Sequence, residues 1–97
     1  MSAATMPTPV GVSKEHITKT PGVCGGKACI AGTRVRVMDV VYWHRTGMTV
    51  EEVPSMFGVP VTVADVYAAL AYYHDHPDEI EAGFEADRRA SEFGKTQ

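Results

Sequence analysis

The sequence has no apolar run long enough to cross a bilayer, which takes about 20 residues. Its N-terminus, MSAATMPTPVG, has neither an early positive charge nor the apolar segment that marks a secretory signal peptide. Cysteine is scarce, with two in 97 residues. These absences predict a cytoplasmic protein, in which disulfides are rare.

Recognisable motifs of catalysis and metal binding are also missing. No Ser, Cys or His lies in a nucleophile motif, and Gly25-Gly26-Lys27 lacks the preceding glycine and the following Ser or Thr of a phosphate-binding loop. Cys24 and Cys29 form one pair, whereas structural zinc usually has two pairs of ligands. We therefore expect no enzymatic activity, no cofactor and no metal. Whether the two cysteines bind metal or form a disulfide stays open.

The length and composition fit one ordinary globular domain, with 44% hydrophobic and 22% charged residues. The net charge of -3 is unevenly distributed. Residues up to Met48 include six basic and two acidic ones, a net charge of +4, and the remainder include three basic and ten acidic ones, a net charge of -7. This separation indicates a basic face and an acidic face with different partners, unless both are simply solvated.

The N-terminal half contains short extended segments. Residues 1–12 are rich in Ser, Ala, Thr and Pro and are predicted to form a disordered arm. Ile17–Lys19 and Ala28–Ile30 are expected to be short strands, joined by a turn at Gly25-Gly26. Thr33–Val37 alternates strictly between polar and apolar residues, which predicts a third strand with one buried face.

The C-terminal half has helical periodicity. Thr49 and Glu52 have the spacing of a capping box, which begins a helix. Thr62 is expected to cap the next helix, with Asp65 at its third position favourable to the positive helix end. The expected helices are Met38–Arg45, Val50 to about Phe57, Val63 to about His74, and the acidic segment Asp78–Phe93.

The two middle helices and the glycine between them have the arrangement of a helix-turn-helix. We therefore predict a mainly α fold, with a homeodomain-like helix-turn-helix domain and a short β-element over residues 13–77 and an acidic helix and tail over residues 78–97. Pro54 is unfavourable inside the first motif helix. The second motif helix has no Lys or Arg, so the fold alone is weak evidence for DNA binding.

A possible nucleic-acid site lies on the predicted third strand. Arg34 and Arg36 are expected on one face of this strand, with Lys27 in the turn before it. Such a pair of arginines can contact phosphates. It can equally protect an edge strand from aggregation.

The helix Val63–His74 is apolar on nearly every side, and a chain of this size cannot surround it. We therefore expect a homodimer. Its interface is expected to contain one aromatic residue from the helix Met38–Arg45 and three residues of the helix Val63–His74: Trp43, Val66, Leu70 and Tyr73.

The acidic tail is the candidate partner-binding element. Its net charge over Asp78–Phe93 is -4, from six acidic and two basic residues, and its apolar stripe is narrow. We expect it to dock loosely in the free protein and to become ordered against a basic partner. Truncation after Pro77 should then preserve the fold. The expected partner contacts are three apolar anchors and two arginines: Ile80, Phe84, Phe93, Arg88 and Arg89.

Three segments, ITKTPGVCGGKACIAGTRVRVMDVV, GMTVEEV and VADVYAALAYYHDHPDEIEA, resemble the bacterial domain-of-unknown-function family four-three-three. The resemblance covers about residues 17–82. Two departures are Ala28, where the family more often has Pro, and Pro54, in a helix that usually lacks it. The resemblance implies a small, mostly helical, homeodomain-like domain that is usually dimeric. It also implies a VapB-type antitoxin of a type II toxin–antitoxin pair, encoded beside a PIN-like nuclease toxin.

The leading hypothesis is therefore a dimeric antitoxin that neutralises this nuclease and binds the DNA of its own operon. One alternative is a dimeric interaction module without DNA binding, and another is a stand-alone DNA-binding regulator.

Overall fold

The structure, a computed structural model, describes residues 15–95, with side chains through residue 92. The predicted arm at residues 1–12 lies outside this range. The elements are two strands, three α-helices and two short 3₁₀ helices: β2 (Ile17–Lys19), a 3₁₀ helix (Cys24–Gly26), β3 (Ala28–Ile30), α1 (Val37–Arg45), a 3₁₀ helix (Val53–Met56), α2 (Val63–Asp75) and α3 (Pro77–Lys95). The prediction of a mainly helical fold with a short N-terminal β-element is confirmed.

The β-element is an antiparallel hairpin in which Ile17 faces Ile30 and Lys19 faces Ala28. Gly25 and Gly26 both have positive φ angles, 66° and 81°, in the connection between the strands. This conformation is cheap only for glycine, which explains the Gly-Gly pair. The hairpin was predicted from the same residues.

The predicted third strand, Thr33–Val37, is wrong. The Thr33 hydroxyl donates to the Ile30 carbonyl and accepts from the Val35 N–H, which closes a tight turn instead. Arg36 makes only an isolated bridge to Cys29, and its N–H donates to the Asp39 carboxylate at 2.9 Å. Because Asp39 caps this end, α1 already begins at Val37.

The predicted helix Val50–Phe57 is also wrong, because this segment is a turn followed by the 3₁₀ helix Val53–Met56. The predicted capping box is present: Glu52 N–H donates to the Thr49 hydroxyl, and Thr49 N–H donates to the Glu52 carboxylate. Pro54 follows directly and has no N–H to donate to the Val50 carbonyl. The α-helical bond pattern therefore stops after the box.

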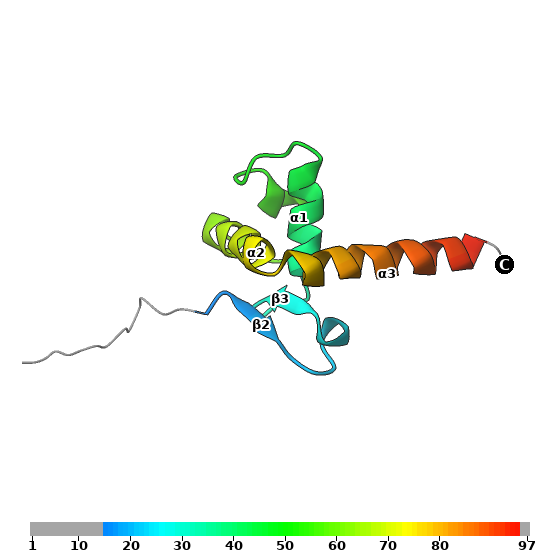
Figure 1. The fold of residues 1–97 in the computed structure, drawn as a ribbon. Coiled ribbons are helices and arrows are strands. Elements are labelled where there is room, and N and C mark those ends of the chain that lie inside the picture. Colours follow the sequence, from blue (N-terminus) through cyan, green and yellow to red (C-terminus); the bar gives the residue numbers. More distant parts are fainter. Residues whose placement is uncertain (1–14, 96–97) are drawn as a thin grey trace, which may run out of the picture.

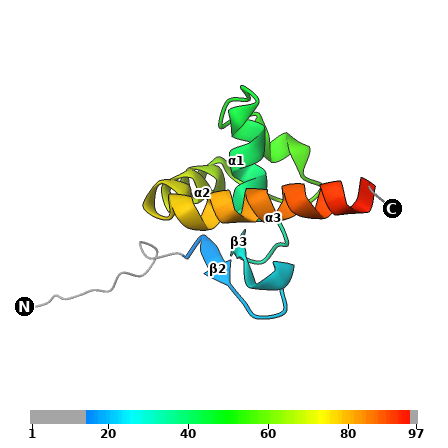
Figure 2. The ribbon, with the colours of Figure 1, turned by 45° about the vertical axis from the view of Figure 1, so that its right-hand side comes forward.

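The core lies where β3 and the helices meet, and its fully buried side chains are Ile30, Val37, Val40, Val53 and Val66. α3 lies between α1 and the hairpin in both ribbon views, and its C-terminal half extends beyond the remainder of the domain (Figures 1 and 2). α3 is thus divided into a docked half, residues 77–84, and a projecting half, residues 85–95.

Candidate functional site

The docked half of α3, residues 77–84, belongs to the core. Ile80 is 5% exposed, and Phe84 is partly buried against the core with the Arg45 guanidinium 4.8 Å from its ring centroid. Gly83 is buried because α3 approaches α1 closely: a Cβ atom here would lie 3.0 Å from the Met38 sulfur. The expectation of a loosely docked tail is therefore wrong for this half, and Ile80 has almost no surface for a partner.

Two carboxylates of the docked half, those of Glu79 and Glu81, are bound by other groups of the chain. Glu79 accepts hydrogen bonds from the Tyr72 hydroxyl and pairs with Lys19 at 3.2 Å. Burial, and then this hydrogen bond, raises the pKa of Tyr72 to about 12. Burial would raise the pKa of Glu79, but its bonds from Tyr72 and Lys19 outweigh burial and lower it. Glu81 likewise accepts from Tyr73 and pairs with Arg45.

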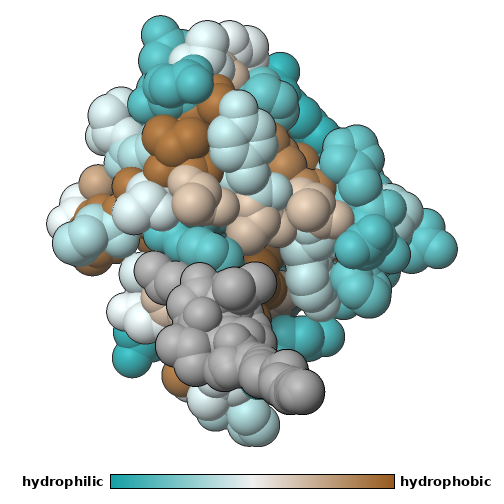
Figure 3. All heavy atoms as spheres, turned by 90° about the vertical axis from the view of Figure 1, so that its left-hand side faces the viewer, coloured by the Kyte–Doolittle hydropathy of each residue, from teal (hydrophilic) through white to brown (hydrophobic). Residues whose placement is uncertain are grey.

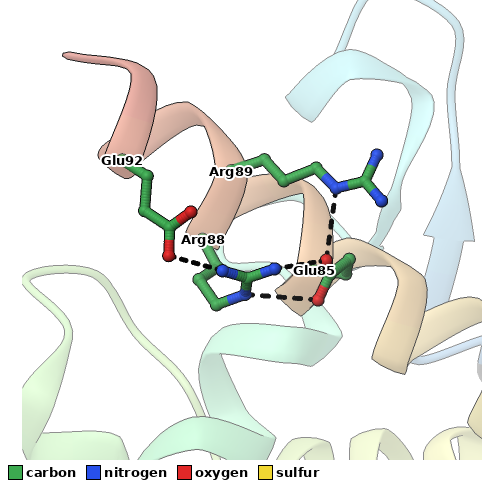
Figure 4. Close-up of polar contacts among 4 residues, drawn as sticks. All are labelled: Glu85, Arg88, Arg89 and Glu92. Carbon is green, nitrogen blue, oxygen red and sulfur yellow. Dashed lines mark hydrogen bonds and ion pairs between the residues drawn. The ribbon is translucent and has the colours of Figure 1, made fainter. Parts of the chain in front are cut away.

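The projecting half, residues 85–95, is stabilised from within the helix. Arg88 pairs with Glu85 and with Glu92, at 2.5 Å each, and Arg89 pairs with Glu85 at 3.2 Å (Figure 4). The hydrogen bond from Arg88 lowers the pKa of Glu85, and the same bond raises the pKa of Arg88. Pairs at these i,i+3 and i,i+4 spacings stabilise a helix that has no packing support.

The side chains of the projecting half are accessible. Arg88 is 54% exposed and Arg89 is 75% exposed, so both predicted partner contacts lie on free surface. Asp87 contacts the domain through Arg36 at 3.4 Å and is itself 52% exposed. The side chain of Phe93, the remaining predicted anchor, lies outside the described part of the structure.

The basic residues predicted to contact nucleic acid do not form one patch. Arg36 is bound to Asp39 and Asp87, and the hydrogen bond with Asp39 raises its pKa. Lys27 lines a groove of about 260 Å³ between the hairpin and α3, whereas Arg34 lines a separate cleft of about 550 Å³. The predicted strand face that was to present Arg34 and Arg36 together is a turn, and Asp87, which pairs with Arg36, lies far away in the sequence. Nucleic-acid binding by these residues stays a prediction.

The residues predicted for a dimer interface pack mainly within the core of their own chain. Val66 is fully buried in its own core, so it has no surface for a second copy. Trp43, Leu70 and Tyr73 are partly buried and pack against that core. Tyr67 was not among the predicted interface residues, and it is 56% exposed on the side of α2 away from the buried Val66.

Asp65 explains which side of α2 faces inward. Its carboxylate accepts the Thr62 N–H and lies 2.7 Å from His16 Nδ1, next to the hairpin. Burial would raise the pKa of Asp65, but the bonds from Thr62 and His16 outweigh burial and lower it. The Thr62 cap, visible in the sequence, sets where α2 begins, whereas the contact between Asp65 and His16 is long-range and shows which side of α2 faces the hairpin.

The two cysteines are free thiols within the hairpin region. Cys24 donates to the Arg34 carbonyl at 3.3 Å. Burial, followed by the hydrogen bond with Cys24, raises the pKa of the Cys29 thiol to about 12. Among the described residues no three His, Cys, Asp or Glu side chains are grouped as metal ligands. Within the same range, no helix combines the length and the apolar character needed to cross a membrane.

The family described as "Protein of unknown function (DUF433)" matches residues 17–73, which is more than half of the chain. The chain belongs to this family. The DUF433 domain is also similar to a solved structure, the crystal structure of a DUF433 member protein from Anabaena variabilis ATCC 29413. That protein is 34% identical, with a TM-score of 0.67 over 76% of this chain and 72% of the other. No curated protein matches this DUF433 chain significantly.

Proposed function

We propose that this DUF433 protein is an antitoxin-like protein that neutralises a PIN-like nuclease through the projecting half of α3. The observation that supports this function is the division of α3. The docked half is fixed by Ile80 and Phe84, whereas residues 85–95 extend beyond the domain. A helix presented in this way can enter a groove on another protein without refolding of the domain.

The chemistry of the projecting half fits a nuclease groove. An RNA-binding groove is basic around an acidic metal centre. Glu85 and Glu92 would face its cations, and Arg88 or Arg89 would pair with the carboxylates of its metal centre. The alanines at positions 86 and 90 are exposed and small, which permits close approach of the helix to the groove wall.

The proposal requires a PIN-like nuclease encoded beside this chain, and that nuclease is used for the test. Purified nuclease is titrated with the intact protein, and cleavage of a labelled RNA is measured. We expect cleavage to cease near equimolar protein, because a helix seated in the groove blocks the RNA. Undiminished cleavage in a large excess of protein would contradict the proposal.

We further propose that the protein acts as a homodimer through the outer face of α2. Ala64, Tyr67, Ala71 and His74 are exposed and follow one another at the three- and four-residue spacing of a helix contact. None carries a fixed charge, so two copies of this face do not repel each other across a two-fold axis. Figure 3, viewed from the side on which α2 lies in Figure 1, shows hydrophobic surface between hydrophilic residues.

Replacing Tyr67 with Glu should convert the dimer into a monomer, because the substitution places two like charges opposite each other at the two-fold contact. Light scattering at micromolar concentration measures the mass. Tyr42→Glu is the matched control, since Tyr42 is 50% exposed on α1 and lies outside this face. A monomeric parent protein, or a dimer that survives Tyr67→Glu, would refute the interface.

The positions of the basic residues favour protein partners over operator DNA as the ligands of this dimer. Arg36 is already paired with two carboxylates, and Lys27 and Arg34 line different clefts. A stable DNA interface neutralises several phosphates. Operon binding would therefore need cations from both copies of the dimer.

A further inference from the structure

A cleft of about 550 Å³ opens beside the hairpin, away from α3, and has no part in the proposed neutralisation. Three segments that are distant in the sequence form it. β2 and the turn after it contribute Thr18, Thr20 and Val23, and the turn before α1 contributes Gly32, Thr33 and Arg34. Val59 comes from the loop that leads to α2. The volume lies within the range of about 300–1,000 Å³ that is typical of small-molecule sites.

Arg34 differs from the other arginines of the described chain. Arg36, Arg45, Arg88 and Arg89 each lie within 4.0 Å of a carboxylate. Arg34 makes no such ion pair within residues 15–92, and no acidic residue lines its cleft. In a protein with a net charge of -3, this cleft therefore holds a cation available for an anionic ligand.

The backbone that carries Arg34 is held in place while its guanidinium is exposed. The Thr33 hydroxyl forms hydrogen bonds with the Ile30 carbonyl and the Val35 N–H, on either side of the turn. Cys24 donates to the Arg34 carbonyl. Thr18 lies on β2 and Thr20 directly after it, and both line the cleft. Their hydroxyls supply further donors at the cleft.

We propose that this cleft binds the phosphate group of a nucleotide-sized ligand. The planar fork of Arg34 binds two phosphate oxygens together, and the hydroxyls of Thr18 and Thr20 donate to the same group. Val23 and Val59 give the remainder of the ligand an apolar wall. A long nucleic-acid strand fits less well, because a single cation and a negatively charged protein oppose a polyanion.

The test follows backbone amide signals by two-dimensional NMR while three probes are added separately: inorganic phosphate, adenosine 5′-monophosphate and a short DNA duplex. Phosphate and the nucleotide should shift the signals of Thr18, Thr20 and Arg34, with the nucleotide binding more tightly through the apolar wall. Arg34→Gln should weaken nucleotide binding about tenfold or more, since a charge-assisted bidentate contact is lost. Arg89→Gln is the control with the same change of charge, at a site 75% exposed on α3.

Absence of shifts at these residues with about 10 mM nucleotide would overturn the proposal, because a Kd above this concentration leaves the site mostly empty. Equal weakening by Arg34→Gln and Arg89→Gln would also overturn it, since only overall charge would then matter. Tight, Arg34-dependent binding of the duplex without nucleotide binding would assign the cleft to nucleic acid instead. None of these outcomes depends on the nuclease.

Discussion

Replacing Ile80 with Asp will unfold the domain, although residue 80 lies in a helix with a strongly acidic sequence. Ile80 is 5% exposed among the core residues of α1, α2 and β3. The substitution removes a buried aliphatic side chain and places an unpaired carboxylate in the core, at a cost of about 3–5 kcal/mol or more. Domains are stable by only about 5–15 kcal/mol, and one this small lies near the lower end of that range, so most of its stability is lost.

Thermal unfolding followed by circular dichroism measures this effect. Ala90→Asp is the matched control, because it adds the same charge to an exposed position in the projecting half of α3. We expect the control to melt within a few degrees of the parent protein. For the same reason, truncation after Pro77 should unfold the domain. An Ile80→Asp variant with an unchanged melting temperature would show that α3 is not docked.

Truncation after Ala86 should have the opposite outcome: a folded domain that no longer neutralises its partner. Through residue 92, the buried residues of α3 all precede this point. The main tertiary contact removed is the pair between Asp87 and Arg36, at 3.4 Å with Asp87 half exposed, and exposed pairs contribute only about 0–1 kcal/mol. Inhibition of the nuclease should weaken at least about 100-fold, because the contacting helix is missing.

Two full-length variants separate the role of side chains from that of helix length. Arg88→Ala combined with Arg89→Ala removes both arginines of the projecting half and should weaken inhibition of the nuclease while the fold persists. Lys27→Ala also removes a positive charge but leaves the projecting half intact, and it should inhibit as the parent protein does. Full inhibition by the truncated chain would move the partner site to another surface.

Local chemistry made much of the fold predictable. Both strands and the turn between them followed from Gly25-Gly26 between two short extended segments, and the start of α2 followed from the Thr62 cap with Asp65 in its first turn. Both depend on neighbours within a few residues, which a sequence pattern records directly. The accessible Arg88 and Arg89 of the candidate site were found for the same reason, because charge on a helix face is a local property.

Long-range contacts account for what the sequence did not predict. The alternation of polar and apolar residues over Thr33–Val37 is typical of a strand. Here it instead accompanies a turn closed by the Thr33 hydroxyl and a helix start capped by Asp39. Arg36 was predicted to be an unpaired cation, but the fold places Asp87 within 3.4 Å of it. Ile80 appeared to belong to a narrow stripe on a solvated helix, and only tertiary packing makes it a core residue.

Hydrogen exchange of the α3 amides, with and without the nuclease, tests the division of this helix most directly. In the free protein, amides around residues 80–84 should be protected and those after residue 86 should exchange faster, because only the first group lies on the core. Addition of the nuclease should slow exchange after residue 86 and leave the docked half unchanged. If the nuclease binds and this segment exchanges as before, the projecting half of α3 is not the partner-binding element.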